Sequence, residues 1–210
     1  PFVHAACDVD RTLSLDGAVP RGDGAVVCYL AADGPIESVD ELLADYQTVT
    51  DVRQIRSETE PLLQVTVTDE TPVTALAAWG ATIKGGEYSP ESARLVAELP
   101  SDGDVRRLVE AVDATVSETK LVAKEETNQT PEPVEAFQDG LDDRLTDRQQ
   151  TVLRTAHLSD YFASPRGSTS AEVAETLDIA GSTRLYHLHH AEQKLVETFI
   201  EDSKPTPTDR

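Results

Sequence analysis

The sequence is short of basic residues, cysteine, methionine and long apolar runs, and each shortage excludes a class of protein. The longest apolar stretches, Val26–Ala32 and Ala75–Trp79, are far shorter than the roughly 20 apolar residues of a membrane helix. The N-terminal residues lack the order of a secretory signal, in which a basic region precedes an apolar one. We therefore expect a cytoplasmic protein with no membrane association.

Sulfur-containing residues add two further exclusions. Cys7 and Cys28 are too few for a disulfide framework and lack the paired spacing of a zinc or dithiol motif. We expect both to be buried and structural. Because the chain contains no methionine, either an initiator was removed ahead of Pro1 or the chain is the tail of a longer protein.

The charge is strongly acidic, with 18 basic against 39 acidic residues and a formal net charge of -21. Such a charge repels nucleic acid phosphates. However, the acidic residues are dispersed and lysine is scarce, a composition suited to high salt, where self-repulsion is screened. Residues 1–140 carry 27 acidic and ten basic residues, a net of -17, whereas residues 141–200 carry nine and six, a net of -3. We expect the acidic part to point away from any DNA.

A polar segment that contains two prolines, residues 125–133, predicts a boundary between two domains. We assign residues 1–130 to an α+β domain, residues 131–140 to a linker and residues 141–210 to a small all-α domain with a polar tail. In the first domain, hydrophobic periodicity predicts helices at 36–46, 72–79 and 105–116, and strands at 25–31, 48–56, 62–68, 81–88, 92–99 and 120–125. This order favours a ferredoxin-like α/β sandwich with helices on one face of a mostly antiparallel sheet.

Residues 1–140 contain little that indicates catalysis. There is no glycine-rich phosphate loop, and His4 is the only histidine before His157, so no Ser-His-Asp or Cys-His set can be assembled. We therefore expect no enzymatic activity and no cofactor. A sheet domain of this kind can dimerise, or it can receive a signal such as a small molecule, and the sequence names no effector.

Three closely spaced helices are predicted from Leu145 onward. Thr146 with Gln149 and Thr169 with Glu172 form capping boxes, and Ser182 is placed to cap the third helix. The apolar face of this helix is expected to comprise Leu185, Leu188, Ala191, Leu195 and Phe199. A short helix, a turn at residues 178–181 and a longer helix are typical of a helix-turn-helix, whose second helix enters the DNA major groove.

The candidate DNA-binding residues lie on the predicted exposed side of the third helix. Spacings of four, three and four place one stripe there, flanked by two further side chains: Thr183, His187, His190 and Lys194, with Arg184 and Tyr186 beside them. We expect Ser182 and Thr183 to meet phosphates and Arg184 to pair with guanine. Arg166 and Arg148 could contact phosphate or bond helix ends, and both alternatives stay open. His187 and His190 could share a metal ion, but no further ligand completes a site, so none is predicted.

Four segments together carry a specific resemblance. Residues 145–150 (LTDRQQ), 161–166 (YFASPR), 169–174 (TSAEVA) and 187–195 (HLHHAEQKL) look like the helix-turn-helix domain of the archaeal bacterio-opsin activator family. The resemblance implies a DNA-binding transcription regulator of halophilic archaea, often with its own N-terminal α+β domain. Implied partners are double-stranded DNA, a second copy of the chain and transcription machinery. Family members commonly have more hydroxyl side chains before the third helix, so base-reading positions are not carried over.

A competing hypothesis is a binding module without direct DNA readout. In it the helical segment docks a protein, or the N-terminal domain senses a small molecule. The negative charge of the helical segment supports protein docking, with three glutamates around the third helix at positions 175, 192 and 197.

Overall fold

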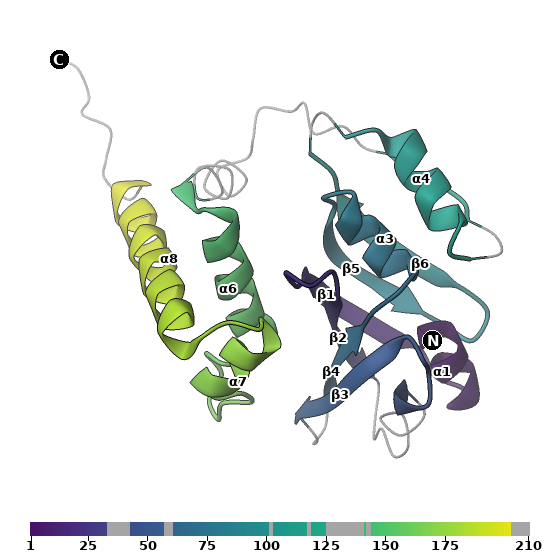
Figure 1. Ribbon diagram of the computed structural model, residues 1–210, viewed down its shortest axis with the longest axis horizontal. Helices are drawn as coiled ribbons and strands as arrows, with labels where there is room; N and C mark the ends of the chain where they lie inside the picture. Colours follow the sequence, from purple (N-terminus) through teal and green to yellow (C-terminus); the bar gives the residue numbers. More distant parts are fainter. Residues whose placement is uncertain are drawn as a thin grey trace.

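One sheet of six strands organises the chain (Figure 1). The computed structural model describes residues 1–32, 43–56, 61–100, 103–116, 119–124, 141 and 144–202. In sequence order, the strands are β1 (Leu13–Pro20), β2 (Val26–Ala32), β3 (Val49–Arg56), β4 (Leu62–Val67), β5 (Thr82–Tyr88) and β6 (Ala93–Glu98). Across the sheet the order is β3-β4-β2-β1-β5-β6, and every neighbouring pair is antiparallel.

The α+β class predicted from the sequence is confirmed, and the structure refines its strand order. Successive strands form three hairpins, β1 with β2, β3 with β4 and β5 with β6. A ferredoxin-like order would instead pair strands across helical crossovers, as βαβ units do. Hairpins lying side by side therefore take the place of the expected split βαβ units.

Central strand β2 is buried on both faces, and its residues divide between two cores. Val26, Cys28 and Leu30 point into a cluster on one face, while Val27 and Tyr29 join a second cluster on the other. Because successive side chains of a strand alternate between faces, a continuous apolar run is what a sheet covered on both sides requires. The run at residues 26–32 is thus a signature of a three-layer arrangement.

The first face is covered by three short helices, α1 (Phe2–Asp8), α3 (Pro72–Ala78) and α4 (Val105–Asp113) (Figure 1). Thr71 caps α3 in a reciprocal capping box with Thr74. Asp104 caps α4 by accepting bonds from two backbone amides, at 3.1 and 3.2 Å. Both helices lie where the sequence predicts them. The helix predicted at 36–46 falls largely outside the described residues, of which only 43 and 44 in this range are helical.

Two parts of the N-terminal prediction are wrong. Residues 119–124 form no strand; Leu121 and Val122 are exposed, and strand-forming residues make a strand only where they meet a pairing partner. Conversely, α1 and β1 were not predicted. The register of β1 shifts between Leu15 and Gly17, so a bulge interrupts the apolar alternation that would have marked this central strand.

The second face is covered by C-terminal helices α6 (Asp147–Leu158), α7 (Ser170–Thr176) and α8 (Gly181–Asp202) (Figure 1). Their capping boxes at Thr146 and Thr169 are those predicted. Val152, Ala156 and Leu177 pack in one cluster with residues of β1, β2 and β4. In the described ranges, no helix is both long and apolar enough to cross a membrane.

Polar contacts reinforce this packing of the helices on the sheet. Thr176 Oγ1 donates to Gln64 Oε1 at 3.2 Å, and both side chains are buried. Arg53 pairs with Glu172 at 2.5 Å, and Arg56 with Asp160 at 3.1 Å. Because these contacts join residues more than 100 positions apart, they fix how the helical segment sits on the sheet.

Candidate nucleic-acid interface

The helix-turn-helix is formed by α7, a tight turn and α8. Asp178 ends α7 with a φ of +51°, in the left-handed region that asparagine and aspartate tolerate best after glycine. The Ile179 amide donates to Ala174 O at 3.0 Å, and the Ile179 side chain packs against the second core. This turn reverses the chain and starts α8 at Gly181, so Ser182 lies within the first turn of the helix and the prediction that it caps α8 is wrong.

The orientation of α8 about its own axis differs from the prediction. Its fully buried side chains are Arg184, Leu188, Ala191 and Thr198, a spacing that follows one helical face. Of the predicted apolar face, Leu188 and Ala191 are buried, whereas three members are exposed by 59%, 37% and 64%: Leu185, Leu195 and Phe199. The buried face thus keeps Leu188 and Ala191 but is rotated about the helix axis toward Arg184 and Thr198.

Arg184 was predicted to be exposed beside the stripe, and this placement is wrong. Its side chain is only 4% exposed and donates through Nη2 to Ser170 Oγ, near the start of α7. Its Cζ lies 5.6 Å from the centre of the Tyr161 ring, a cation–π distance. Arg184 therefore joins α7, α8 and the connector between α6 and α7 rather than facing a ligand.

Lys194 is likewise engaged within the domain. Its Nζ donates to the Arg144 carbonyl at 2.7 Å and to Gln149 Oε1 at 2.8 Å. These bonds attach α8 to the start of α6. Lys194, predicted to lie on the exposed stripe, therefore faces the other helices. His187 and His190, on the same stripe, are half-buried.

The face that α8 does expose contains some residues that were predicted to contact DNA and others that were not. Ser182, Thr183 and Tyr186 are exposed as predicted, and so are Leu185, His189 and Gln193, which were not proposed as contacts. A leucine at helical spacing indicates a core position, so nothing in the sequence pattern indicates that the Leu185 side chain is exposed to solvent. The exposed face of the first three turns thus consists of Ser182, Thr183, Leu185, Tyr186, His189 and Gln193.

Aromatic contacts hold part of this face in place. The Tyr186 ring meets the His190 ring edge-on at a centroid distance of 4.4 Å and the His187 ring at 5.4 Å. Edge-to-face packing of this kind restricts ring rotation. Tyr186 therefore packs against two histidine rings of its own helix, although 60% of it is exposed.

The two other predicted basic residues belong to other parts of the helical segment than α8. Arg166 is exposed, and its Cζ stands 5.0 Å from the Tyr161 ring that Arg184 also contacts. This shared ring places Arg166 near the first turn of α8. Arg148, in the first turn of α6, is half-buried. Among the residues that the structure describes, no three His, Cys, Asp or Glu side chains are grouped as a metal site requires.

Glu172 combines helix capping with the contact to the sheet. Its Oε2 accepts from the Thr169 amide at 2.6 Å, and its Oε1 pairs with Arg53. The hydrogen bond from the Thr169 amide, supported by the Arg53 guanidinium, lowers the pKa of the Glu172 carboxyl below its ordinary value. This carboxylate therefore stabilises both the start of α7 and its position on β3.

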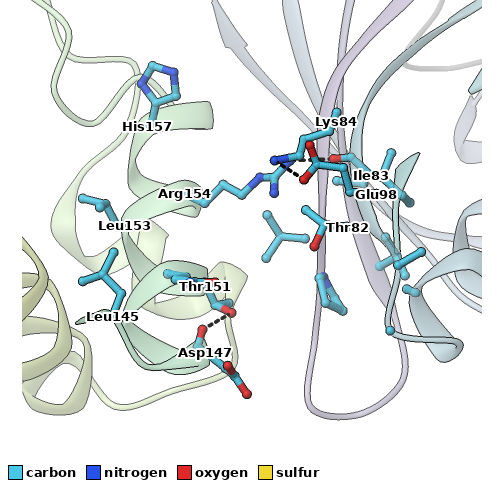
Figure 2. Close-up of a pocket in the computed structure, with 18 of the residues that line it drawn as sticks. Thr82, Ile83, Lys84, Glu98, Leu145, Asp147, Thr151, Leu153, Arg154 and His157 are labelled. Atoms are coloured by element: carbon cyan, nitrogen blue, oxygen red, sulfur yellow. Dashed lines mark hydrogen bonds and ion pairs between the residues drawn. The ribbon is translucent and has the colours of Figure 1, made fainter. Parts of the chain in front are cut away.

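A cleft of about 910 Å³ opens between the sheet and α6 (Figure 2). Strand residues Thr82, Ile83 and Lys84 line one wall and helix residues such as Thr151 the other. Arg154 reaches across from α6, and its Nη2 donates to Ile83 O at 2.6 Å. Lys84 is paired with Glu98 at 2.6 Å. The cleft thus contacts both the sheet and the helical segment.

The chain matches two family models that together cover most of its length. Residues 1–139 match the model described as BAT: GAF and HTH_10 associated domain. Residues 145–197 match HTH_10, described as an HTH DNA binding domain. The second match contains all of α6 and α7 and most of α8.

Three curated relatives from haloarchaea are similar to the chain. A Haloferax volcanii protein named "Putative transcriptional regulator" is 35% identical over 96% of this chain and 35% of its own length. The bacterioopsin transcriptional activator of Halobacterium salinarum is 32% identical over 96% of this chain and 30% of its own length. The transcriptional regulator NarO of Haloferax volcanii is 48% identical over 28% of each chain. The chain therefore spans about a third of the length of the first two relatives.

Proposed function

Because this chain belongs to the family defined by the BAT domain, and carries an HTH DNA binding domain after it, we propose that it regulates transcription by binding double-stranded DNA. The observation that carries the proposal is that the last three helices differ in how much of their surface is buried. α6 and α7 supply most of the helical side chains of the second core, while α8 leaves one face of its first three turns in solvent. A second helix exposed in this way is what entry into a major groove requires.

The polar groups around this face suit the backbone of a duplex. The hydroxyls of Ser182 and Thr183 lie at the N-terminus of α8, where free amides and the helix dipole favour phosphate. Arg166 is exposed near the same end. We assign phosphate contacts to these three residues and to Arg148, and base contacts to the neighbouring exposed residues of α8.

The acidic N-terminal domain is proposed to serve as the input or dimerisation domain. Most of the negative charge belongs to residues 1–140, and the sheet lies on the opposite side of α6 from α8 (Figure 1). This arrangement keeps the excess acid away from a duplex bound at α8. The second core couples the two parts mechanically, so a ligand or a partner on the sheet domain would shift the helices with it.

DNA binding is tested by fluorescence anisotropy with duplexes enriched from a random-sequence pool, in molar potassium chloride. Arg166→Ala is expected to weaken binding to all sequences about equally and to reduce the slope of log K against log salt by about one unit. The matched control is Arg106→Ala on α4, whose side chain is fully in solvent on the other side of the sheet. Equal effects of the two substitutions, or no enrichment of any duplex, would overturn the proposal.

The dimer is tested separately, by light scattering of the chain free and bound to DNA at high salt. Two copies on two half-sites are expected, since paired helix-turn-helix domains read sites one helical turn apart. A monomer in both states would remove the dimer from the proposal and leave DNA binding in place.

A further inference from the structure

The exposed face of the first three turns of α8 carries no charged side chain. It consists of Ser182, Thr183, Leu185, Tyr186, His189 and Gln193. Specific helix-turn-helix proteins read bases with side chains at this end of the second helix. The chemistry of these six residues therefore limits which features of a base pair can be recognised.

Recognition of guanine is disfavoured by this arrangement. The commonest specific contact to guanine is a paired bond from arginine or lysine to O6 and N7. Arg184 is buried and bonded to Ser170, and Lys194 is bonded to the start of α6. Gln193, which could pair with adenine, donates to Glu197 Oε1 at 2.8 Å within the same helix.

The most exposed large side chains on this face are apolar or amphipathic. Leu185 is 59% and Tyr186 is 60% exposed, at adjacent positions in the second turn. A single exposed leucine is ordinary on a protein surface. Here Leu185 stands beside a tyrosine ring that is held by two histidine rings, 4.4 and 5.4 Å away. Leu185 and Tyr186 are thus the two large side chains that the second turn of α8 leaves in solvent.

The major groove offers an exposed leucine one apolar partner among unmodified bases, the C5-methyl group of thymine. We propose that Leu185, supported by Tyr186, selects A·T base pairs by packing against a thymine methyl group. The proposal rests on the proposed function, because it specifies what α8 reads once it lies in the groove. It assigns specificity to a residue that the sequence pattern places in the core.

The test compares duplexes that differ only in this methyl group. Wild-type protein is used to enrich duplexes from a random-sequence pool, and the best duplex is then resynthesised with deoxyuridine in place of each thymidine in turn. One position is expected to lose about fourfold in affinity, the factor that corresponds to roughly 0.8 kcal/mol for one buried methylene-sized group.

Leu185→Ala shows whether this discrimination belongs to Leu185. In this variant the ratio of affinities for thymidine and deoxyuridine duplexes is expected to fall to about one, as in a double-mutant cycle that removes both partners. Val196→Ala is the control, since Val196 is a similarly exposed apolar residue three turns further along α8 and should keep the fourfold ratio. Thermal melting checks that both variants are folded.

The outcomes separate the two proposals. If no duplex is enriched, the proposed function fails. If duplexes bind but deoxyuridine is tolerated at every position, thymine recognition is wrong while DNA binding stands. If Leu185→Ala keeps the wild-type ratio, the methyl group acts through the shape of the DNA, and the assignment to Leu185 is wrong.

Discussion

Replacing Leu177 in the helix-turn-helix with alanine is expected to destabilise the N-terminal domain as well. Leu177 follows α7 and is 2% exposed. It packs in the second core, to which the sheet contributes Val27, Tyr29 and Leu62. A leucine-to-alanine change at a buried site costs about 2–5 kcal/mol, because the lost transfer energy is increased by the cavity that remains. The sheet shares this core, so it should share the loss.

The size of the effect can be stated as a melting temperature. A domain of 150–250 residues loses about 2–4 °C for each kcal/mol, so a loss of about 3 kcal/mol lowers the midpoint by roughly 6–12 °C. Trp79 is the only tryptophan and directly follows α3, on the other side of the sheet from α7. Trp79 belongs to the N-terminal domain, so its fluorescence follows the unfolding of that domain. We expect the Trp79 transition of Leu177→Ala to shift by this amount in molar potassium chloride.

Leu185→Ala is the matched control, because it makes the same chemical change in the same domain at a side chain that is 59% exposed. Its effect is expected to stay within about 0.5 kcal/mol. The reasoning would be refuted if Leu177→Ala left the Trp79 midpoint unchanged while the helical circular dichroism signal melted earlier. That result would mean that the two parts unfold independently despite their packing.

Three further predictions follow from individual contacts. Arg184→Lys should lower the free energy of unfolding by about 1–3 kcal/mol in thermal melts, since lysine cannot reproduce a planar guanidinium over the Tyr161 ring; unchanged stability with lost DNA binding would instead place Arg184 in the interface. Glu172 has a lowered pKa, so its stabilisation is present above the ordinary value of 4.5 and is lost as the pH falls through the folded-state value. Glu172→Gln should therefore reduce the acid-induced loss of stability, and an unaltered pH profile would contradict this. Arg154→Ala removes the bond to Ile83 O and should speed amide exchange in α6, measured by mass spectrometry; unchanged exchange would show that the bond does not hold α6 against the sheet.

The elements that were predictable are those defined by local sequence. Thr146 with Gln149, and Thr169 with Glu172, form the expected reciprocal caps because each pair is only three residues apart. Strand β2 was predictable from its continuous apolar run, and β4 from valines that alternate with threonines. In such cases the information that fixes the element lies within a few residues.

The orientation of α8 could not be predicted, because distant partners decide it. Arg184 is buried by virtue of Ser170 and Tyr161, and Lys194 is held by residues about 50 positions earlier. A helix with leucines on one side and long basic side chains on the other is most simply arranged with the leucines inside. Here the side chains of Arg184 and Lys194 bond to other parts of the domain. The helix is therefore oriented so that Leu185 is exposed to solvent.

The central claim is that the exposed face of the first turns of α8 meets DNA, and site-specific cross-linking measures this directly. His189, on that face, is replaced by photoreactive benzoylphenylalanine, and Arg94, exposed on strand β6, is replaced in the same way as the control. Each variant is irradiated with the duplex enriched from the random pool. The account predicts cross-linked DNA from position 189 and none from position 94. Cross-links from position 94 with none from position 189 would contradict it.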